Sequence, residues 1–220
     1  MDWQRARSDE KKDERKAAIC AAAMRLFQKS GYEKVTLNGI AVEAGFAKSN
    51  LYRYFSSREE IFLSIFSRLF SQWSAAWSKR LKGFDENEPI PNFAESWVQS
   101  FLANPAFLDL TTVLFVSLER NSSYEQLVEF KRHSMNLLYP LSLEISRIYP
   151  ELNNEQAFQC LSLSFAATSN YCALATQNDA LKKIYEQEEF APLRPNFESD
   201  LRAAVEITVH GLLSIANESN

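Results

Sequence analysis

The feature that most constrains the fold is a run of apolar side chains at helical spacing between residues 61 and 81, uninterrupted by glycine or proline. Apolar residues that recur at i, i+3 and i+4 lie on one face of an α-helix. The stripe consists of Ile61, Phe62, Ile65, Phe66, Leu69, Phe70, Trp73, Ala76, Trp77 and Leu81. A helix of about six turns with a face this apolar is stable only when other elements cover that face.

The rest of the chain shows the same helical periodicity, and only 5 Gly and 7 Pro interrupt its 220 residues. Start and stop signals bound further helices near residues 9–30, 36–44, 48–54, 93–103, 105–118, 122–148, 153–178 and 196–216. The predicted start signals include a cap at Thr36 and capping boxes that begin at Ser56 or Ser57, at Ser122 and at Asn153. A charged, proline-containing segment at 83–91 is the clearest break between them. No stretch alternates as a strand does, so we predict an all-α fold of nine or ten helices.

Charge is divided unevenly along the chain. The net charge is −4, but residues 1–60 carry 12 Lys and Arg against 9 Asp and Glu, whereas residues 61–220 carry 12 against 19. A basic N-terminal part on an acidic body is typical of a protein whose contact with nucleic acid is confined to one small module. Ordinary variation in charge explains the asymmetry equally well, so the charge alone decides nothing.

Cysteine use and the lack of a targeting signal predict a cytoplasmic protein. Cys20, Cys160 and Cys172 are odd in number and far apart, which argues against a disulfide framework. The charged N-terminus lacks the apolar core of a signal peptide. Residues 157–178 carry no charge, but their many polar side chains argue against a membrane span. We interpret this stretch as a helix buried between its own core and a second subunit.

Residues 36–55 predict two short helices joined by a tight turn. A helix-turn-helix needs a small residue where the two helices touch, a residue that tolerates positive φ in the turn, and an apolar anchor in the second helix. Ala41, Gly45 and Leu51 supply these three at suitable separations. The sequence offers no explanation for Gly39 in the middle of the first of these helices.

The same segment carries a resemblance to a known family. Thr36-x-x-x-Ile-Ala, followed by Leu51-Tyr-Arg-Tyr-Phe-Ser-Ser-Arg-Glu-Glu-Ile-Phe62, resembles the tetracycline-repressor (TetR) family of regulators over residues 15–66. The resemblance implies a three-helix DNA-binding domain, here residues 1–55, and a helical ligand-binding and dimerisation domain, here residues 56–220. It also implies a sequence-specific transcriptional regulator, a ligand-responsive repressor that binds a palindromic operator in double-stranded DNA as a homodimer.

The resemblance places the contacts to DNA at and around the second short helix. Its exposed start, which enters the major groove, holds the implied base contacts Ala47, Lys48, Ser49 and Asn50. Lys can reach guanine O6 and N7, and Asn can pair with adenine N6 and N7. Phosphate contacts are implied for Thr36, Tyr52, Tyr54 and Arg58. Because the family commonly has Ser, Gly and Thr where this chain has Ala47, Ser49 and Asn50, the base preference does not transfer.

The second domain is expected to hold a pocket and a dimer interface. A pocket for a small apolar or aromatic effector is predicted from aromatic residues at inward positions, most of which are expected to be ordinary core: Trp97, Phe101, Phe107, Phe115, Tyr139 and Phe165. The uncharged helix and the last helix are expected to form a four-helix dimer interface. Its predicted members are Ala167, Tyr171, Val205 and Leu212.

Other function classes lack support in the sequence. No phosphate-binding glycine loop, nucleophile elbow or metal-binding cluster is visible, so we expect neither enzymatic activity nor a cofactor nor a metal site. His133 and His210 have no ligand-type neighbours at metal-binding spacing. The alternative that stays open is a non-enzymatic helical protein-interaction module without operator recognition.

Overall fold

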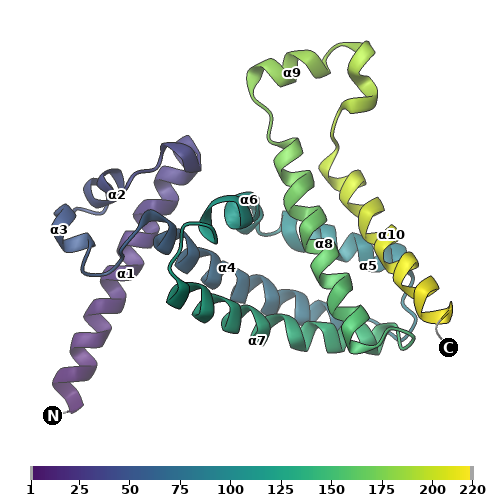
Figure 1. Ribbon diagram of the computed structural model, residues 1–220, viewed down its shortest axis with the longest axis horizontal. Helices are drawn as coiled ribbons and strands as arrows, with labels where there is room; N and C mark the ends of the chain where they lie inside the picture. Colours follow the sequence, from purple (N-terminus) through teal and green to yellow (C-terminus); the bar gives the residue numbers. More distant parts are fainter. Residues whose placement is uncertain (1, 219–220) are drawn as a thin grey trace. The chain divides into compact units, whose positions relative to one another are not determined.

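The computed structural model describes residues 2–218, with side chains from residue 11 onward. Within this range the chain forms ten α-helices and no strand, so the predicted all-α fold is confirmed (Figure 1). The chain divides into two compact units. Unit 1 comprises the residues up to Arg68 together with Val113–Lys131, and unit 2 comprises Leu69–Thr112 and the residues from Arg132. The domain boundary between residues 55 and 56 stays a prediction.

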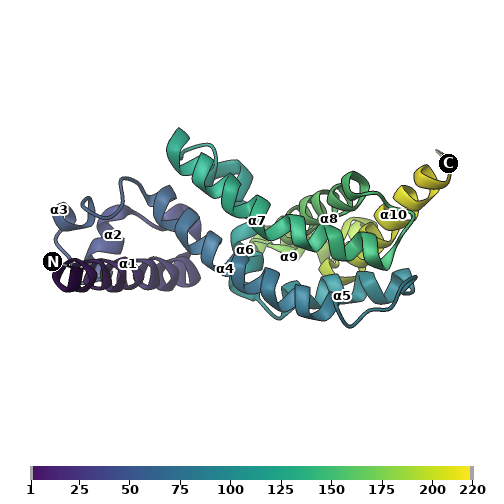
Figure 2. The same cartoon turned by 90° about the horizontal axis from the view of Figure 1, so that it is seen from below.

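Unit 1 is built around a three-helix cluster. α1 (Asp2–Ser30) leads through a 3-10 turn, η1 (Tyr32–Lys34), to α2 (Leu37–Glu43) and the short α3 (Lys48–Leu51). α2 packs against both α1 and α3 (Figure 2). The buried side chains of the cluster are small or apolar: Ile19, Ala22, Ala23, Phe27, Ile40, Ala41, Leu51 and Phe55.

Two glycines and a threonine fix the geometry of the helix-turn-helix. Gly45 has φ 72°, which a residue with a side chain adopts only with strain, so the predicted turn glycine is confirmed. Thr36 caps α2 by accepting a hydrogen bond from the Gly39 backbone N–H at 3.0 Å. A Cβ at Gly39 would lie 3.2 Å from the Thr36 hydroxyl oxygen. This crowding explains the glycine that the sequence left unexplained.

The helix starts follow local capping signals with two corrections. α4 (Arg58–Leu81) begins with the Glu60 backbone N–H donating to the Ser57 hydroxyl at 3.0 Å, as predicted. α7 (Tyr124–Ile148) is capped by Ser123, one residue later than predicted. The single helix predicted over residues 105–118 is wrong, because α6 (Pro105–Val113) passes into a π-helical turn, η2 (Leu114–Leu118).

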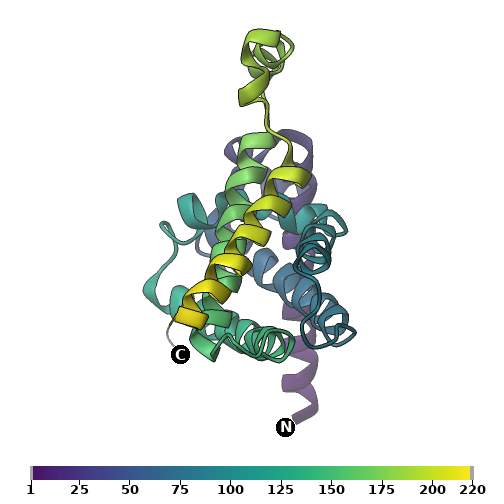
Figure 3. The ribbon, with the colours of Figure 1, turned by 90° about the vertical axis from the view of Figure 1, so that its right-hand side faces the viewer.

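Unit 2 contains the C-terminal parts of α4 and α7, the other helices and a core rich in aromatic residues. α5 (Ile90–Leu102) and α8 (Asn154–Ala175) both pack against α10 (Phe197–Glu218), and α8 and α10 run side by side (Figure 3). The predicted Asn153 and Gln156 capping box opens α8. α9 (Asp179–Tyr185) and the 3-10 segment η3 (Glu188–Leu193) connect α8 to α10 without a buried residue of their own.

All three cysteines are free and buried. Burial raises the pKa of the Cys160 thiol to about 12 and that of Cys172 to about 11, which keeps both thiols unreactive.

No single helix of residues 2–218 is long and apolar enough to cross a membrane; only the bent pair Ile90–Leu102 and Pro105–Leu118 reaches that length and composition together.

Candidate nucleic-acid interface

α3 presents the predicted base-contact residues to solvent. Lys48, Ser49 and Asn50 are consecutive and exposed, while the next residue, Leu51, is buried and anchors the helix in the three-helix cluster. Ala47 precedes them in an extended conformation and makes no side-chain cap. A short helix that is anchored by a buried residue and exposes three polar side chains has the form required to enter a groove of DNA.

Hydroxyl groups flank this helix. Tyr52 is 49% exposed, and Lys48 Nζ lies 5.9 Å from the centroid of its ring. Thr36 is exposed at the start of α2, and its capping bond uses an oxygen lone pair rather than the hydroxyl hydrogen. Tyr54 is half-buried, and its hydroxyl accepts a hydrogen bond from Arg15 at 3.0 Å. These groups can donate hydrogen bonds to phosphate oxygens beside α3.

Arg58, a predicted phosphate contact, makes its hydrogen bonds inside the chain. Its Nη1 donates to the backbone oxygens of Tyr32 and Val35 at 3.3 and 3.0 Å. Its Nε and Nη2 donate to one carboxylate oxygen of Glu59 at 3.1 and 2.9 Å. The guanidinium carbon also lies 4.2 Å from the centroid of the Tyr32 ring. Arg58 therefore ties the first turn of α4 to η1, a role that the sequence did not predict.

Tyr32 links these residues by hydrogen bonds to a part of the chain that is distant in sequence. Its buried hydroxyl accepts a hydrogen bond from Ser117 of η2 at 3.0 Å and donates one to Glu59 at 3.2 Å. Burial raises the pKa of the Tyr32 phenol, so the hydroxyl keeps the proton that it donates. Side chains from η1, η2 and α4 thus form one polar network in unit 1.

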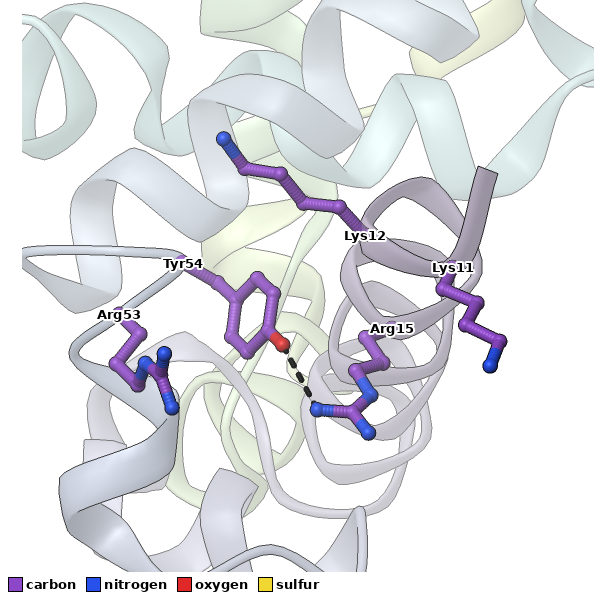
Figure 4. A pocket seen from close by; sticks show the side chains of 5 residues that line it. All are labelled: Lys11, Lys12, Arg15, Arg53 and Tyr54. Carbon is purple, nitrogen blue, oxygen red and sulfur yellow. Dashed lines mark hydrogen bonds between the residues drawn. The ribbon is translucent and has the colours of Figure 1, made fainter. Parts of the chain in front are cut away.

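A cluster of cations that was not predicted from the sequence lies beside α3. Lys11, Lys12 and Arg15 of α1, together with Arg53 and Tyr54, line an open concavity of about 410 Å³ (Figure 4). We call these five residues the basic pocket. The signal that could have revealed it is the spacing of the three α1 cations, which puts them on one face of a helix.

Family comparisons cover most of the chain. The family model for the "Tetracyclin repressor-like, C-terminal domain" matches residues 67–216, and the model for "Bacterial regulatory proteins, tetR family" matches residues 19–65. The chain belongs to the TetR family. The resemblance seen in the helix-turn-helix sequence is thereby confirmed.

Individual relatives of this TetR-family protein match only part of the chain. The uncharacterized HTH-type transcriptional regulator YfiR of Bacillus subtilis is 43% identical over 56 residues, which are 26% of this chain and 27% of that protein. The regulator EthR of Mycolicibacterium smegmatis is 28% identical over 96 residues, which are 43% of this chain and 44% of that protein. The matches thus span less than half of either relative.

Solved structures show the same fold over nearly the whole chain. A TetR/AcrR-family regulator from Thermobifida fusca superposes with a TM-score of 0.57 at 18% identity, covering 90% of this chain and 98% of that one. FadR of Thermus thermophilus in complex with lauroyl-CoA gives a TM-score of 0.57 at 17% identity, covering 89% and 94%. At these identities the likeness establishes the fold alone.

The structure separates the predicted pocket residues of this TetR-family protein into two groups. Trp97, Phe101 and Phe107 are buried, and the ring centroid of Phe165 lies 6.2 Å from that of Phe101 and 6.4 Å from that of Phe107. Two others point outward: Phe115 is 46% exposed and Tyr139 is 51% exposed. Phe115 lies in η2, where the wider π-helical turn shifts the side-chain positions expected of an α-helix.

The predicted interface residues are also divided. Ala167 and Tyr171 are partly exposed on α8, but Val205 and Leu212 are buried within the single chain and offer no surface to a partner. These two residues were assigned to the wrong side of α10 because this helix is apolar on two sides. The outer sides of α8 and α10 carry other exposed apolar residues, which are Leu163 and Leu174 on α8 and Ile207 and Ile215 on α10.

Replacement of Arg58 by alanine is expected to lower the free energy of unfolding by about 1.5–3 kcal/mol, because hydrogen bonds from a charged group to η1 and Glu59 are lost. Thermal denaturation measures this effect. Arg25→Ala is the matched control, since Arg25 makes an exposed ion pair with Glu43 that is worth about 0–1 kcal/mol. An Arg58→Ala protein as stable as the control would contradict the structural role of Arg58.

Proposed function

We propose that this protein is a cytoplasmic, ligand-responsive repressor that binds a palindromic operator in double-stranded DNA as a homodimer. The observation that carries the proposal is α3, which presents Lys48, Ser49 and Asn50 to solvent and is anchored by the buried Leu51. The ammonium group of Lys48 and the amide of Asn50, at exposed positions on either side of Ser49, suit the edges of bases in the major groove. Membership of a family of bacterial regulatory proteins supports the same reading.

The proposed dimer uses the outer sides of α8 and α10. Leu163 and Leu174 on α8 and Ile207 and Ile215 on α10 are between 46% and 70% exposed in the single chain. Residues 157–178, which include most of α8, carry no charge. Two such helices from each subunit can form an isologous four-helix interface about a two-fold axis. A two-fold axis in turn requires an operator of two inverted half-sites.

A selection from genomic DNA tests this function. Purified protein is incubated with fragments of the genome that encodes it, and bound fragments are footprinted. We expect protection of an inverted repeat whose half-site centres lie a near-integral number of helical turns apart, about 34–36 Å per turn. Retention of no fragment above random DNA would contradict the proposal and favour a protein-interaction module instead.

The proposed effector is a small apolar molecule with one polar group, bound in unit 2. The aromatic cluster around Trp73 and Phe107 provides the apolar surface. Trp77 Nε1 and Tyr149 Oη are buried without a hydrogen-bond partner in the described residues, and both rings pack edge-on against Phe93. An unpaired buried donor costs about 1–3 kcal/mol, which a polar group of a ligand would recover. FadR structures of the same fold hold lauroyl-CoA and stearoyl-CoA.

The cavity between α4 and α5 can take an effector only if the helices move. This cavity, lined by Trp73, Trp77 and Ser100 among others, measures about 60 Å³, whereas pockets for ligands of drug size measure roughly 300–1,000 Å³. A ligand that binds there must therefore displace α4 or α5. Since α4 continues from unit 1 into unit 2 as one helix, its displacement is a direct route from the effector to the DNA-binding helices.

The effector is expected to lower operator affinity about 5- to 150-fold, the usual range of allosteric coupling. Apolar metabolites are screened by thermal shift, and each compound that binds is titrated with and without operator DNA. Thermodynamic reciprocity requires that operator weaken the compound by the same factor. A tight binder with identical affinity in both titrations would contradict the proposed sensing mechanism while leaving DNA binding intact.

A further inference from the structure

We propose that the basic pocket is a second DNA contact, which binds backbone phosphates next to the bases read by α3 and does so independently of base sequence. The inference rests on the proposed function and adds a site to it. Its ligand chemistry is a phosphate oxyanion, supplied by the phosphodiester backbone of the duplex. The pocket adjoins α3 directly, because Arg53 and Tyr54 follow the end of that helix at Leu51.

The charge of the pocket is of one sign. Its lining holds four cationic side chains and a phenol, and no carboxylate. Rotation by about 100° per residue along α1 places Lys11, Lys12 and Arg15 within a quarter to a third of the helix circumference. The same rotation puts the neighbouring Asp13 on the opposite side, and Glu14, about 60° from Lys11, is not part of the lining. Four cations that share a concavity without counter-charge repel one another and favour a bound anion.

Arg15 and Tyr54 are arranged to hold that anion. Arg15 Nη1 donates to the Tyr54 hydroxyl oxygen at 3.0 Å, and the ring of Tyr54 lies between Lys12, Arg15 and Arg53 (Figure 4). The bond occupies a lone pair of the hydroxyl, so the hydroxyl hydrogen is directed away from the guanidinium. Arg15 retains further N–H groups for a second acceptor. One phosphate can thus accept from both a phenol and a guanidinium, a charge-assisted pair.

Three of the five residues of the basic pocket belong to a part of α1 that lies outside the matched family region. The N-terminal family model begins at residue 19, and the first buried residue of α1 from Lys11 onward is Ile19. Lys11, Lys12 and Arg15 stand on the helix before that point, where α1 has no core of its own to cover. A polyanionic partner would explain why exposed cations gather on this part of the helix.

Salt titrations of DNA affinity test the inference. Arg15→Ala is expected to weaken binding by the same factor on operator and on a scrambled duplex, and to reduce the slope of log affinity against log salt by about 0.9, the value for one lost phosphate contact. Lys29→Ala is the matched control, because it removes one exposed cation from the same helix outside the pocket. Lys29→Ala should leave the salt slope unchanged on both operator and scrambled duplex.

Three results would overturn the inference. If Arg15→Ala keeps the wild-type slope while wild-type protein binds operator, the basic pocket lies off the DNA and the proposed function stands. If wild-type protein binds no duplex, both proposals fail together. If calorimetry shows that pyrophosphate binds the pocket at submillimolar concentration in an Arg15-dependent manner while DNA affinity is unaffected by Arg15→Ala, the site serves a free anion instead of the duplex.

Discussion

Ile207→Glu is expected to convert the protein to monomers that lose about 10²- to 10⁴-fold in operator affinity. Ile207 is 70% exposed on the outer side of α10, so glutamate is tolerated in the single chain. In the proposed dimer the same position is covered by the partner, and burying an unpaired carboxylate there costs several kcal/mol. A monomer engages one half-site at a time and loses the gain in effective concentration that linked binding provides.

Sedimentation velocity and footprinting measure the two parts of this prediction. Met135→Glu is the matched control, because Met135 is an apolar residue of α7 with 50% exposure and lies outside the α8 and α10 surfaces. The control should remain dimeric and protect the operator. If Ile207→Glu also remains dimeric, the interface lies elsewhere on the chain.

Lys48→Ala and Asn50→Ala are each expected to cost about 1–3 kcal/mol of operator affinity, or roughly 5- to 150-fold. Both side chains are exposed at the start of α3 and do not support the core, so the loss reflects contacts with bases. Base preference should relax at one position of each half-site for each variant. Affinity for random DNA should change little for Asn50→Ala, since an amide neutralises no phosphate.

Competition binding with single-base operator variants shows these effects. Val42→Ala is a useful control, because Val42 is exposed on α2, outside the residues placed at bases. Operator affinity and base preference that survive both Lys48→Ala and Asn50→Ala would show that α3 is not the helix that reads the DNA.

The features that the sequence predicted correctly are those set by neighbours along the chain. The Thr36 cap, the positive φ of Gly45 and the capping box of Asn153 each depend on residues within a few positions. The burial of Leu51 follows from the helical spacing around it. Such signals are complete within one or two helical turns, so local patterns suffice to predict them.

The features that could not be predicted from the sequence depend on tertiary packing, or on helices such as α10 that are apolar on two sides. The Ser117 hydroxyl reaches Tyr32 across 85 positions of sequence, which no local spacing reveals. α10 carries Val205 on its inner side and Ile207 on its outer side, and periodicity alone does not say which faces the chain's own core. The start of α1 at Asp2, rather than near residue 9, has no apolar stripe to mark it.

Sequence-specific DNA binding is tested by the ratio of operator affinity to scrambled-duplex affinity at fixed physiological salt. We expect wild-type protein to bind the selected inverted repeat about 10³- to 10⁷-fold more tightly than a duplex of the same length and composition in scrambled order. We also expect Asn50→Ala to reduce this ratio. Equal affinity for the two duplexes would contradict operator recognition by α3, because its exposed residues would then read no sequence.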